Sequence, residues 1–216
     1  MEEKALEIAQ VEDVIQRKSV VREYAEALVY AIILALVIRT FVVQAFKIPS
    51  GSMIPTLLSG DHILVNKFIY GVKVPFTDTT LVHFKKPQRG DIIVFKYPED
   101  EKRDFIKRVV GLPGETVEIH NKQVYINGKA LKESYTIYRD EGYLPDSTSP
   151  RDNYGPTRIS AGHLFVMGDN RDNSMDSRFW GFLDETKIKG KAFLIYFSWN
   201  GEQHGVRWKR IGDLIR

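Results

Sequence analysis

The apolar stretch from Tyr24 to Phe46 constrains the fold of this chain more than any other feature of its sequence. As a helix rising about 1.5 Å per residue it would be roughly 34 Å long, enough to cross the hydrocarbon core of a bilayer. Arg39, near its end, can extend its guanidinium to the headgroups while its methylenes stay in lipid. A buried helix of a soluble protein is the alternative, because the charge-free part, 27–38, is short. The sequence favours a membrane span.

The residues that flank this stretch predict its orientation. Arg17, Lys18 and Arg22 precede it, and basic residues are retained on the cytoplasmic side of a membrane. A cleaved signal peptide is a second interpretation, but no small-x-small cleavage site closes the apolar run. We therefore expect a cytoplasmic segment at 1–23, an uncleaved single-pass anchor at 24–45, and the rest of the chain outside the cytoplasm.

Beyond the anchor, short runs rich in β-branched and aromatic residues alternate with Gly, Asp and Pro. This punctuation is typical of strands, and Asn127-Gly128 is a favourable pair for a tight hairpin. We predict an all-β fold, an antiparallel β domain at 46–114 and 160–216 with a small inserted β subdomain at 115–159. The expected strands are 62–70, 92–95, 105–110, 116–120, 124–126, 164–167 and 192–197.

Composition excludes several classes of function. The chain has no cysteine, so disulfides, a thiolate nucleophile and cysteine-based metal sites are ruled out. Its five histidines are far apart and match no metal-ligand spacing, so we expect no metal and no cofactor. The formal net charge of +3 is spread without a basic stripe, which argues against nucleic acid as a partner.

Two separate stretches carry residues suited to chemistry. Ser50 and Ser52 flank Gly51 directly after the anchor. In the strand predicted around Lys107, alternation places this lysine on the same face as Phe105 and Val109. Burial disfavours the charged ammonium, so such a lysine can accept a proton near neutral pH. A lysine that extends to solvent or pairs with an acid is the ordinary alternative.

A third stretch, 168–178, is dense in acids and amides. It does not fit a calcium loop, because neither possible register has the required glycine and glutamate. A tight turn in which Asp176 forms an ion pair with Arg178 is a structural explanation for the acidic and amide residues of this stretch. Among serine chemistries, the S-x-x-K and G-x-S-x-G patterns are absent, whereas a Ser/His/Asp triad stays open because its members need not be near in sequence.

Three segments carry distinctive motifs: Ile48-Pro-Ser-Gly-Ser-Met with Pro55-Thr-Leu, Ile106-Lys-Arg-Val-Val-Gly-Leu-Pro-Gly114, and Met167-Gly-Asp-Asn-Arg-Asp-Asn-Ser-Met-Asp-Ser-Arg178. Taken together, they resemble the signature boxes of bacterial type I signal peptidases, the leader peptidases with a Ser/Lys dyad. The anchor and the stretch 89–95 fit as well, and the resemblance extends to residues 210–212.

The resemblance implies a role for each residue. Ser52 is the expected nucleophile and Lys107 its general base. Ser50 and the Ser52 N–H would stabilise the oxyanion, Ser174 would orient the lysine amine, and Gly168 would leave room around it. Asp176 and Arg178 would hold the loop. The residues that match the family's substrate-binding positions are Phe46, Ile48, Pro49, Met53, Leu57, Ile63, Val94, Phe105 and Ile106.

By the same resemblance, the substrates are secretory preproteins with small residues before the cleavage site, and the enzyme is a serine endopeptidase in the bacterial cytoplasmic membrane. The lipid bilayer is then a second partner. The family often has tyrosine where this chain has Phe105, so any hydroxyl contact there is lost. A non-catalytic, membrane-anchored β domain that binds peptides by strand addition is the alternative function.

Overall fold

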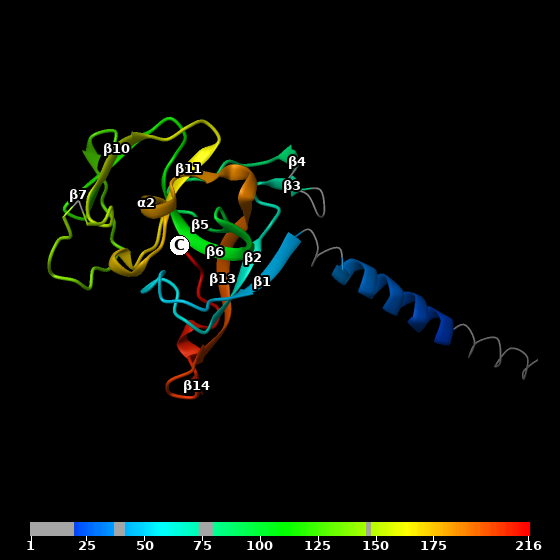
Figure 1. Cartoon of the computed structure of the whole chain (residues 1–216). Helices are drawn as coiled ribbons and strands as arrows, with labels where there is room; N and C mark the ends of the chain where they lie inside the picture. Colours follow the sequence, from blue (N-terminus) through cyan, green and yellow to red (C-terminus); the bar gives the residue numbers. More distant parts are fainter. Residues whose placement is uncertain (1–19, 37–41, 74–79, 146–147) are drawn as a thin grey trace, which may run out of the picture. The chain divides into compact units, whose positions relative to one another are not determined.

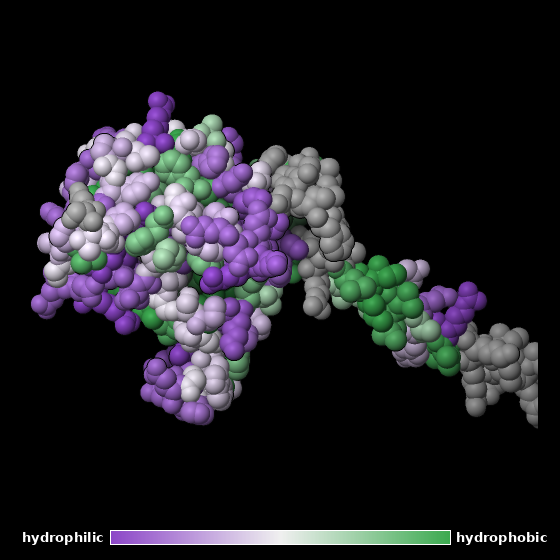
Figure 2. All heavy atoms as spheres, viewed as in Figure 1, coloured by the Kyte–Doolittle hydropathy of each residue, from purple (hydrophilic) through white to green (hydrophobic). Residues whose placement is uncertain are grey.

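A computed structural model describes residues 20–36, 42–73, 80–145 and 148–216. The chain divides into two compact units, Met1–Val42 and Val43–Arg216 (Figure 1). In the first unit, residues 20–36 form a helix, and every one of them is solvent-exposed. Large apolar side chains such as Leu28, Tyr30 and Leu34 are more than half exposed, and Figure 2 shows a hydrophobic surface along this helix.

The structure bears only partly on the segment expected to be an anchor. Within the described ranges, no helix has both the length and the apolar character needed to cross a membrane. Residues 37–41, in the middle of the expected span of 24–45, lie outside the described residues. Residues 43–45, expected at the end of the span, belong to strand β1, Val43–Lys47, which pairs with β2, Asp61–Asn66, from Val43↔Asn66 to Lys47↔His62.

The described strands form three sheets, and every strand pairing is antiparallel, which confirms the predicted β class. The largest has the order β1-β2-β13-β5-β6-β11-β12, with β14 paired to β13. Its remaining strands are β5 (Ile92–Tyr97), β6 (Asp100–Gly111), β11 (His163–Met167), β12 (Leu183–Asp184), β13 (Ile188–Asn200) and β14 (Gly205–Val206). The other two sheets are β10-β7-β8-β9 and β3-β4.

The second sheet lies within the stretch expected as an insertion. Its strands are β7 (Thr116–His120), β8 (Gln123–Ile126), β9 (Lys129–Ala130) and β10 (Tyr154–Arg158). Asn127 and Gly128 connect β8 to β9, and both have positive φ, 50° and 75°, as a two-residue hairpin turn requires. The third sheet is the hairpin β3 (Gly71–Lys73) and β4 (Thr80–His83).

Strand β5 lies in the middle of the largest sheet and is buried on both faces. Ile92 and Val94 pack into one core cluster, whereas Ile93 and Phe95 pack into another, as a period of two residues dictates. A third cluster lies against the second sheet and contains Val117 and Phe165. Every residue of these three clusters belongs to the unit Val43–Arg216.

Short helical turns connect the later strands. They are η2 (Arg171–Asn173), α2 (Ser177–Trp180), η3 (Glu185–Lys187) and η4 (Trp208–Arg210). Asp176 caps α2, because its carboxylate accepts a hydrogen bond from the Arg178 N–H. The loop that carries η2 and α2 follows β11, the neighbour of β6, so the sheet order brings this loop close to the strand that contains Lys107.

Candidate active site

Ser52 and Lys107 meet in the folded chain although 55 residues separate them. A hydrogen bond of 2.8 Å joins Lys107 Nζ to Ser52 Oγ, and a second one, of 3.1 Å, runs from Nζ to the Ile106 carbonyl. Ser52 is 9% exposed and Lys107 is 4% exposed. The hydroxyl and the amine therefore face each other with little exposure to solvent.

The surroundings of Lys107 favour its neutral form. Desolvation by burial lowers the pKa of Lys107 from its ordinary value of 10.5 to about 8, even though the nearby charges of Asp176 and Asp169 act in the opposite direction. The Phe105 ring contributes to this burial, with Nζ 5.3 Å from the ring centroid. A pKa of about 8 leaves a substantial neutral fraction at mildly alkaline pH, when the amine can accept a proton.

The loop 168–178 contains the ion pair that the sequence suggested. Arg178 donates two hydrogen bonds to the Asp176 carboxylate, of 2.8 and 2.9 Å, and both side chains are buried. Burial by itself would raise the pKa of Asp176, but the charge and hydrogen bonds of Arg178 lower it below its ordinary value. Asp176 also accepts the Gly168 N–H at 3.1 Å, so the pair fixes the backbone of the loop at both ends.

Ser174 lies beside this pair, but its hydroxyl is not bonded to the lysine. Its Oγ is buried and has no well-aligned hydrogen bond within the described part of the chain, although it is near enough to Asp176 to help lower the pKa of that carboxyl. Gly168 explains the close packing here, because a Cβ at this position would lie 2.3 Å from Ser174 Oγ and 2.5 Å from the Ser52 carbonyl oxygen. The room that Gly168 leaves is thus taken up by the two serines.

A buried network that the sequence did not predict ties the three motif segments together. Arg108 forms a bidentate ion pair with Asp169, at 2.8 and 2.7 Å, and Thr56 Oγ1 donates to the same carboxylate at 2.5 Å. Asn170 adds two contacts to residues 48–57, which we call the serine segment. Its side-chain amide donates to the Gly51 carbonyl, and its backbone N–H donates to the Ser52 carbonyl. All these residues lie in the motifs quoted above, at positions where alternation alone assigns no partner.

The serine and the lysine lie in the wall of an open pocket of about 710 Å³. Of the residues predicted to bind substrate, Pro49, Phe105 and Ile106 line it, as does Ser50. In the part of the chain that the structure describes, the Ser52 N–H makes no hydrogen bond and is free to donate to a ligand. Other residues line the pocket that the sequence did not single out: Ile54, Arg103, Asp104, Arg139, Asn170, Asn173 and Met175.

The remaining residues predicted to bind substrate lie in the core beneath this region. They belong to the first core cluster, in which all but Phe46 are buried, and none of them lines the pocket. They are Phe46, Ile48, Met53, Leu57, Ile63 and Val94. Their apolar character is explained by packing between the serine segment and strands β2, β5 and β6.

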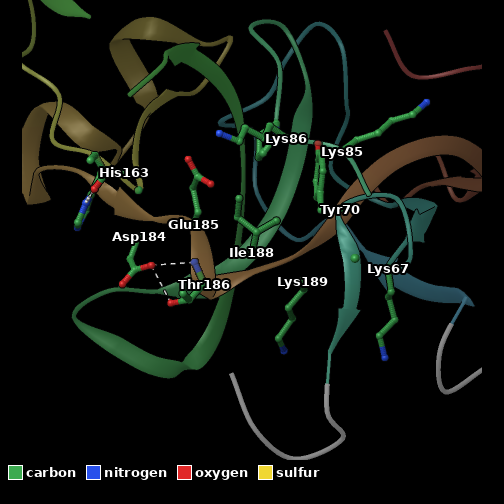
Figure 3. Close-up of a pocket in the computed structure, with 14 residues that line it drawn as sticks. Lys67, Tyr70, Lys85, Lys86, His163, Asp184, Glu185, Thr186, Ile188 and Lys189 are labelled. Atoms are coloured by element: carbon green, nitrogen blue, oxygen red, sulfur yellow. Dashed lines mark hydrogen bonds between the residues drawn. The ribbon is translucent and has the colours of Figure 1, made fainter. Parts of the chain in front are cut away.

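A second pocket, of about 610 Å³, shares no lining residue with the first. Figure 3 shows Lys67 and Lys189 pointing the same way at one side of it, with Glu185 and Lys86 at another. Partial burial and then the charge of Lys189 lower the pKa of Lys67, and Lys189 is paired with Asp104 at 2.7 Å. Its lining includes the hydroxyls of Thr186 and Tyr70, which donate to Asp184 and Asp91, and no serine among the described residues.

The first pocket holds the parts of a hydrolytic site. It contains a hydroxyl next to an amine that can accept a proton, and a free backbone N–H that can donate to a developing negative charge. No group of three or more potential metal ligands occurs within the described residues. The chemistry that these groups support is attack of a hydroxyl on a carbonyl, the chemistry of serine hydrolases.

Comparison with known proteins identifies the family. The signal peptidase family, peptidase S26, matches residues 21–199. Signal peptidase I of Pseudomonas aeruginosa is 42% identical over 206 residues, which cover 82% of this chain and 72% of that protein. The probable signal peptidase I-1 of Synechocystis is 40% identical over 200 residues, 89% of this chain and 88% of that protein. A signal peptidase I structure from Enterococcus faecalis aligns with 50% of this chain and 97% of its own, at 36% identity and a TM-score of 0.41. The chain belongs to the signal peptidase family and is a peptidase that cleaves signal peptides.

Proposed function

We propose that this protein is a membrane-bound serine endopeptidase that removes signal peptides from secretory preproteins with a Ser52–Lys107 dyad. The observation that carries the proposal is the 2.8 Å hydrogen bond between Lys107 Nζ and Ser52 Oγ in a buried setting. Lys107 has no carboxylate partner within hydrogen-bonding distance among the described residues, so it is not held as a permanent ion pair.

In the proposed mechanism, neutral Lys107 removes the Ser52 proton as Oγ attacks the scissile carbonyl. The carbonyl oxygen becomes an oxyanion, which the free Ser52 N–H and the Ser50 hydroxyl stabilise. Lys107 then gives its proton to the departing amine, and an ester on Ser52 remains. Water, deprotonated by the same lysine, hydrolyses this ester and restores the serine.

The supporting groups hold the dyad in place. Gly168 allows Ser174 and the Ser52 carbonyl to pack closely, and the Asp176–Arg178 pair fixes the loop that contains them. A reactive geometry requires positions defined to a fraction of an ångström, and buried ion pairs provide such rigidity. Ser174 would orient the lysine amine, and its hydroxyl packs against Gly168 beside the Ser52 carbonyl.

The helix of residues 20–36 supports attachment to the membrane. Its successive large apolar residues, such as Leu28, Val29 and Tyr30, are exposed, and a helix that is apolar around its circumference belongs in an apolar environment. We place the N-terminus in the cytoplasm and the unit Val43–Arg216 on the extracytoplasmic side of the bacterial cytoplasmic membrane. A signal peptide in the same bilayer would then present its cleavage site at the surface where Ser52 acts.

The test is the processing of a purified preprotein, reconstituted in liposomes, by the wild-type protein and by Ser52→Ala and Lys107→Ala. Both variants should lose at least about a thousandfold in rate, because each removes a partner of the covalent step. Ser59→Ala is the matched control, because Ser59 is exposed and its hydroxyl contacts only the Pro49 carbonyl. Undiminished cleavage by either dyad variant would refute the assignment. Binding without cleavage by the wild type would favour the non-catalytic peptide-binding function.

A further inference from the structure

Two arginines without an acidic partner line the pocket that contains Ser52 and Lys107. They are Arg103 and Arg139, and both side chains are exposed. Among the described residues, neither guanidinium forms an ion pair or a hydrogen bond to a carboxylate. Most other arginines close to this pocket are bound, as Arg108 is to Asp169 and Arg171 to Glu133.

Two aromatic rings hold Arg103, which lines the pocket. Its guanidinium carbon lies 5.4 Å from the Phe105 ring centroid and 5.7 Å from that of Tyr97. These two rings are themselves stacked, 4.2 Å apart with an interplanar angle of 9°. Contact with these rings restricts the guanidinium without neutralising it, so the charge remains available to a ligand.

The segment that carries Arg139 is held by backbone hydrogen bonds. The N–H groups of Arg139 and Asp140 both donate to the buried Asp172 carboxylate, at 2.6 and 2.9 Å. Nearby, Ile137 exchanges backbone hydrogen bonds with Asp169 and Arg171. The segment that carries Arg139 is thus attached to the same loop that supports the dyad, while its side chain points to no partner of its own.

The charges along the pocket do not balance. Asp104 is the one acidic residue among the lining residues, and Lys189 pairs with it at 2.7 Å. When Lys107 is neutral, as its proposed role requires, the positive charges of Arg103 and Arg139 remain without a negative partner among the lining residues. A pocket with this excess attracts negative groups and repels positive ones.

Strand β6 indicates where along a substrate this charge acts. Its pairing with β11 begins at Arg108, so residues 104–107 pair with β5 on one edge and have no described strand on the other. A peptide strand added to this edge would run from Lys107 towards Arg103, four residues away, which is about 13 Å at the rise of a β-strand. Arg103 would therefore contact a side chain several residues from the scissile bond.

We propose that Arg103 and Arg139 make this peptidase select substrates with an acidic side chain several residues from the scissile bond, and disfavour a basic one there. This inference rests on the proposed function and concerns the substrate class of the same site. The residues next to the scissile bond are chosen by pocket shape, whereas this second preference is electrostatic and acts at a distance from the reacting atoms.

The experiment uses the full chain in detergent and a series of cleavable peptides. Within the series, one position at a time, from six residues before to six after the scissile bond, carries Glu, Gln or Lys. We expect one position, about four residues from the bond, at which Glu exceeds Gln in kcat/KM by about twofold to fivefold, as for partly exposed ion pairs, and Lys falls below Gln. The preference should shrink in 1 M salt, where screening is strong.

Charge reversal separates recognition from a structural effect. In Arg103→Glu or Arg139→Glu the ratio of Glu to Lys substrates should invert at that position, which loss of packing would not produce. Arg158→Glu is the matched control, because Arg158 is exposed on β10 and does not line this pocket. Equal rates for Glu and Lys substrates at every position, with the neutral peptide still cleaved, would overturn the inference alone. Failure to cleave any peptide would overturn the proposed function and the inference with it.

Discussion

At the scale of single residues, Lys107 combines a cost in stability with a use in chemistry. A shift of its pKa from 10.5 to about 8 means that the folded state disfavours the charged amine by about 3 kcal/mol relative to the unfolded state. Because the folded pKa is the lower one, this penalty is complete below pH 8, diminishes between pH 8 and 10.5, and is absent above. The chain tolerates the penalty at neutral pH, and the same burial would let the amine act as the base that we propose.

The pH dependence of cleavage follows from the same shift. If neutral Lys107 is the base, kcat/KM should be nearly constant above pH 9 and fall about tenfold per pH unit below pH 8, as protonation removes the active form. Initial rates with a neutral peptide between pH 5.5 and 10 measure this limb. A fall in rate centred near pH 6.5, the ordinary pKa of histidine, would argue against a lysine base. Among the described residues, no histidine lines the pocket.

At the scale of structural elements, the loop 168–178 supports the dyad by close packing. Arg108 on β6 and Thr56 in the serine segment both donate hydrogen bonds to the buried carboxylate of Asp169, which belongs to the loop. The Arg108 guanidinium also lies 3.9 Å from the centre of the Tyr135 ring, which comes from the stretch between β9 and β10. Separating Arg108 from Asp169 would leave a buried charge without a partner, which is costly in free energy. The elements that carry these two residues therefore hold their positions together.

Gly168 offers a direct test of this packing. In Gly168→Ala the new methyl group would meet Ser174 Oγ at 2.3 Å and the Ser52 carbonyl oxygen at 2.5 Å, so the loop or the serine segment must shift. We expect a loss of stability of about 1–3 kcal/mol, measured by urea unfolding, and at least about a hundredfold lower kcat. Gly201→Ala is the control, because a Cβ there meets nothing within 4 Å, and it should leave both quantities unchanged. Wild-type activity in Gly168→Ala would show that the close packing is dispensable.

At the scale of the whole molecule, the residues needed for folding and those proposed for membrane attachment are separate along the chain. The three core clusters, the dyad and the pocket all belong to Val43–Arg216. The first unit contributes an exposed apolar helix. Attachment to a bilayer would raise the effective concentration of the enzyme at substrates held in the same surface.

A truncated chain of residues 43–216 tests this division. We expect a single cooperative unfolding transition and a kcat/KM for a soluble peptide within about twofold of the full chain, because no core residue is removed. Processing of a preprotein embedded in liposomes should fall at least about tenfold, because the effective concentration is lost. Equal processing of the embedded preprotein by both chains would contradict the role of the first unit.

The periodic and local features of this fold could be predicted from the sequence. Runs such as Ile92 to Phe95 predicted strands, and Asn127-Gly128 predicted a hairpin, because local sterics and a period of two residues decide both. Strand β1 was not predicted. Its residues, Val43–Lys47, continue the apolar run of the preceding segment, and only their pairing with β2 makes them a strand.

The same division applies to the candidate site. The sequence by itself determined which residue types were available, a pair of serines after an apolar segment, a lysine among apolar neighbours and an acidic loop, because these depend on order along the chain. Only the tertiary structure decided that Lys107 Nζ lies 2.8 Å from Ser52 Oγ, that most apolar residues predicted to bind substrate lie in the core, and that two unpaired arginines line the pocket. Contacts between residues 55 or more positions apart arise from strand register and sheet order, which local patterns do not encode.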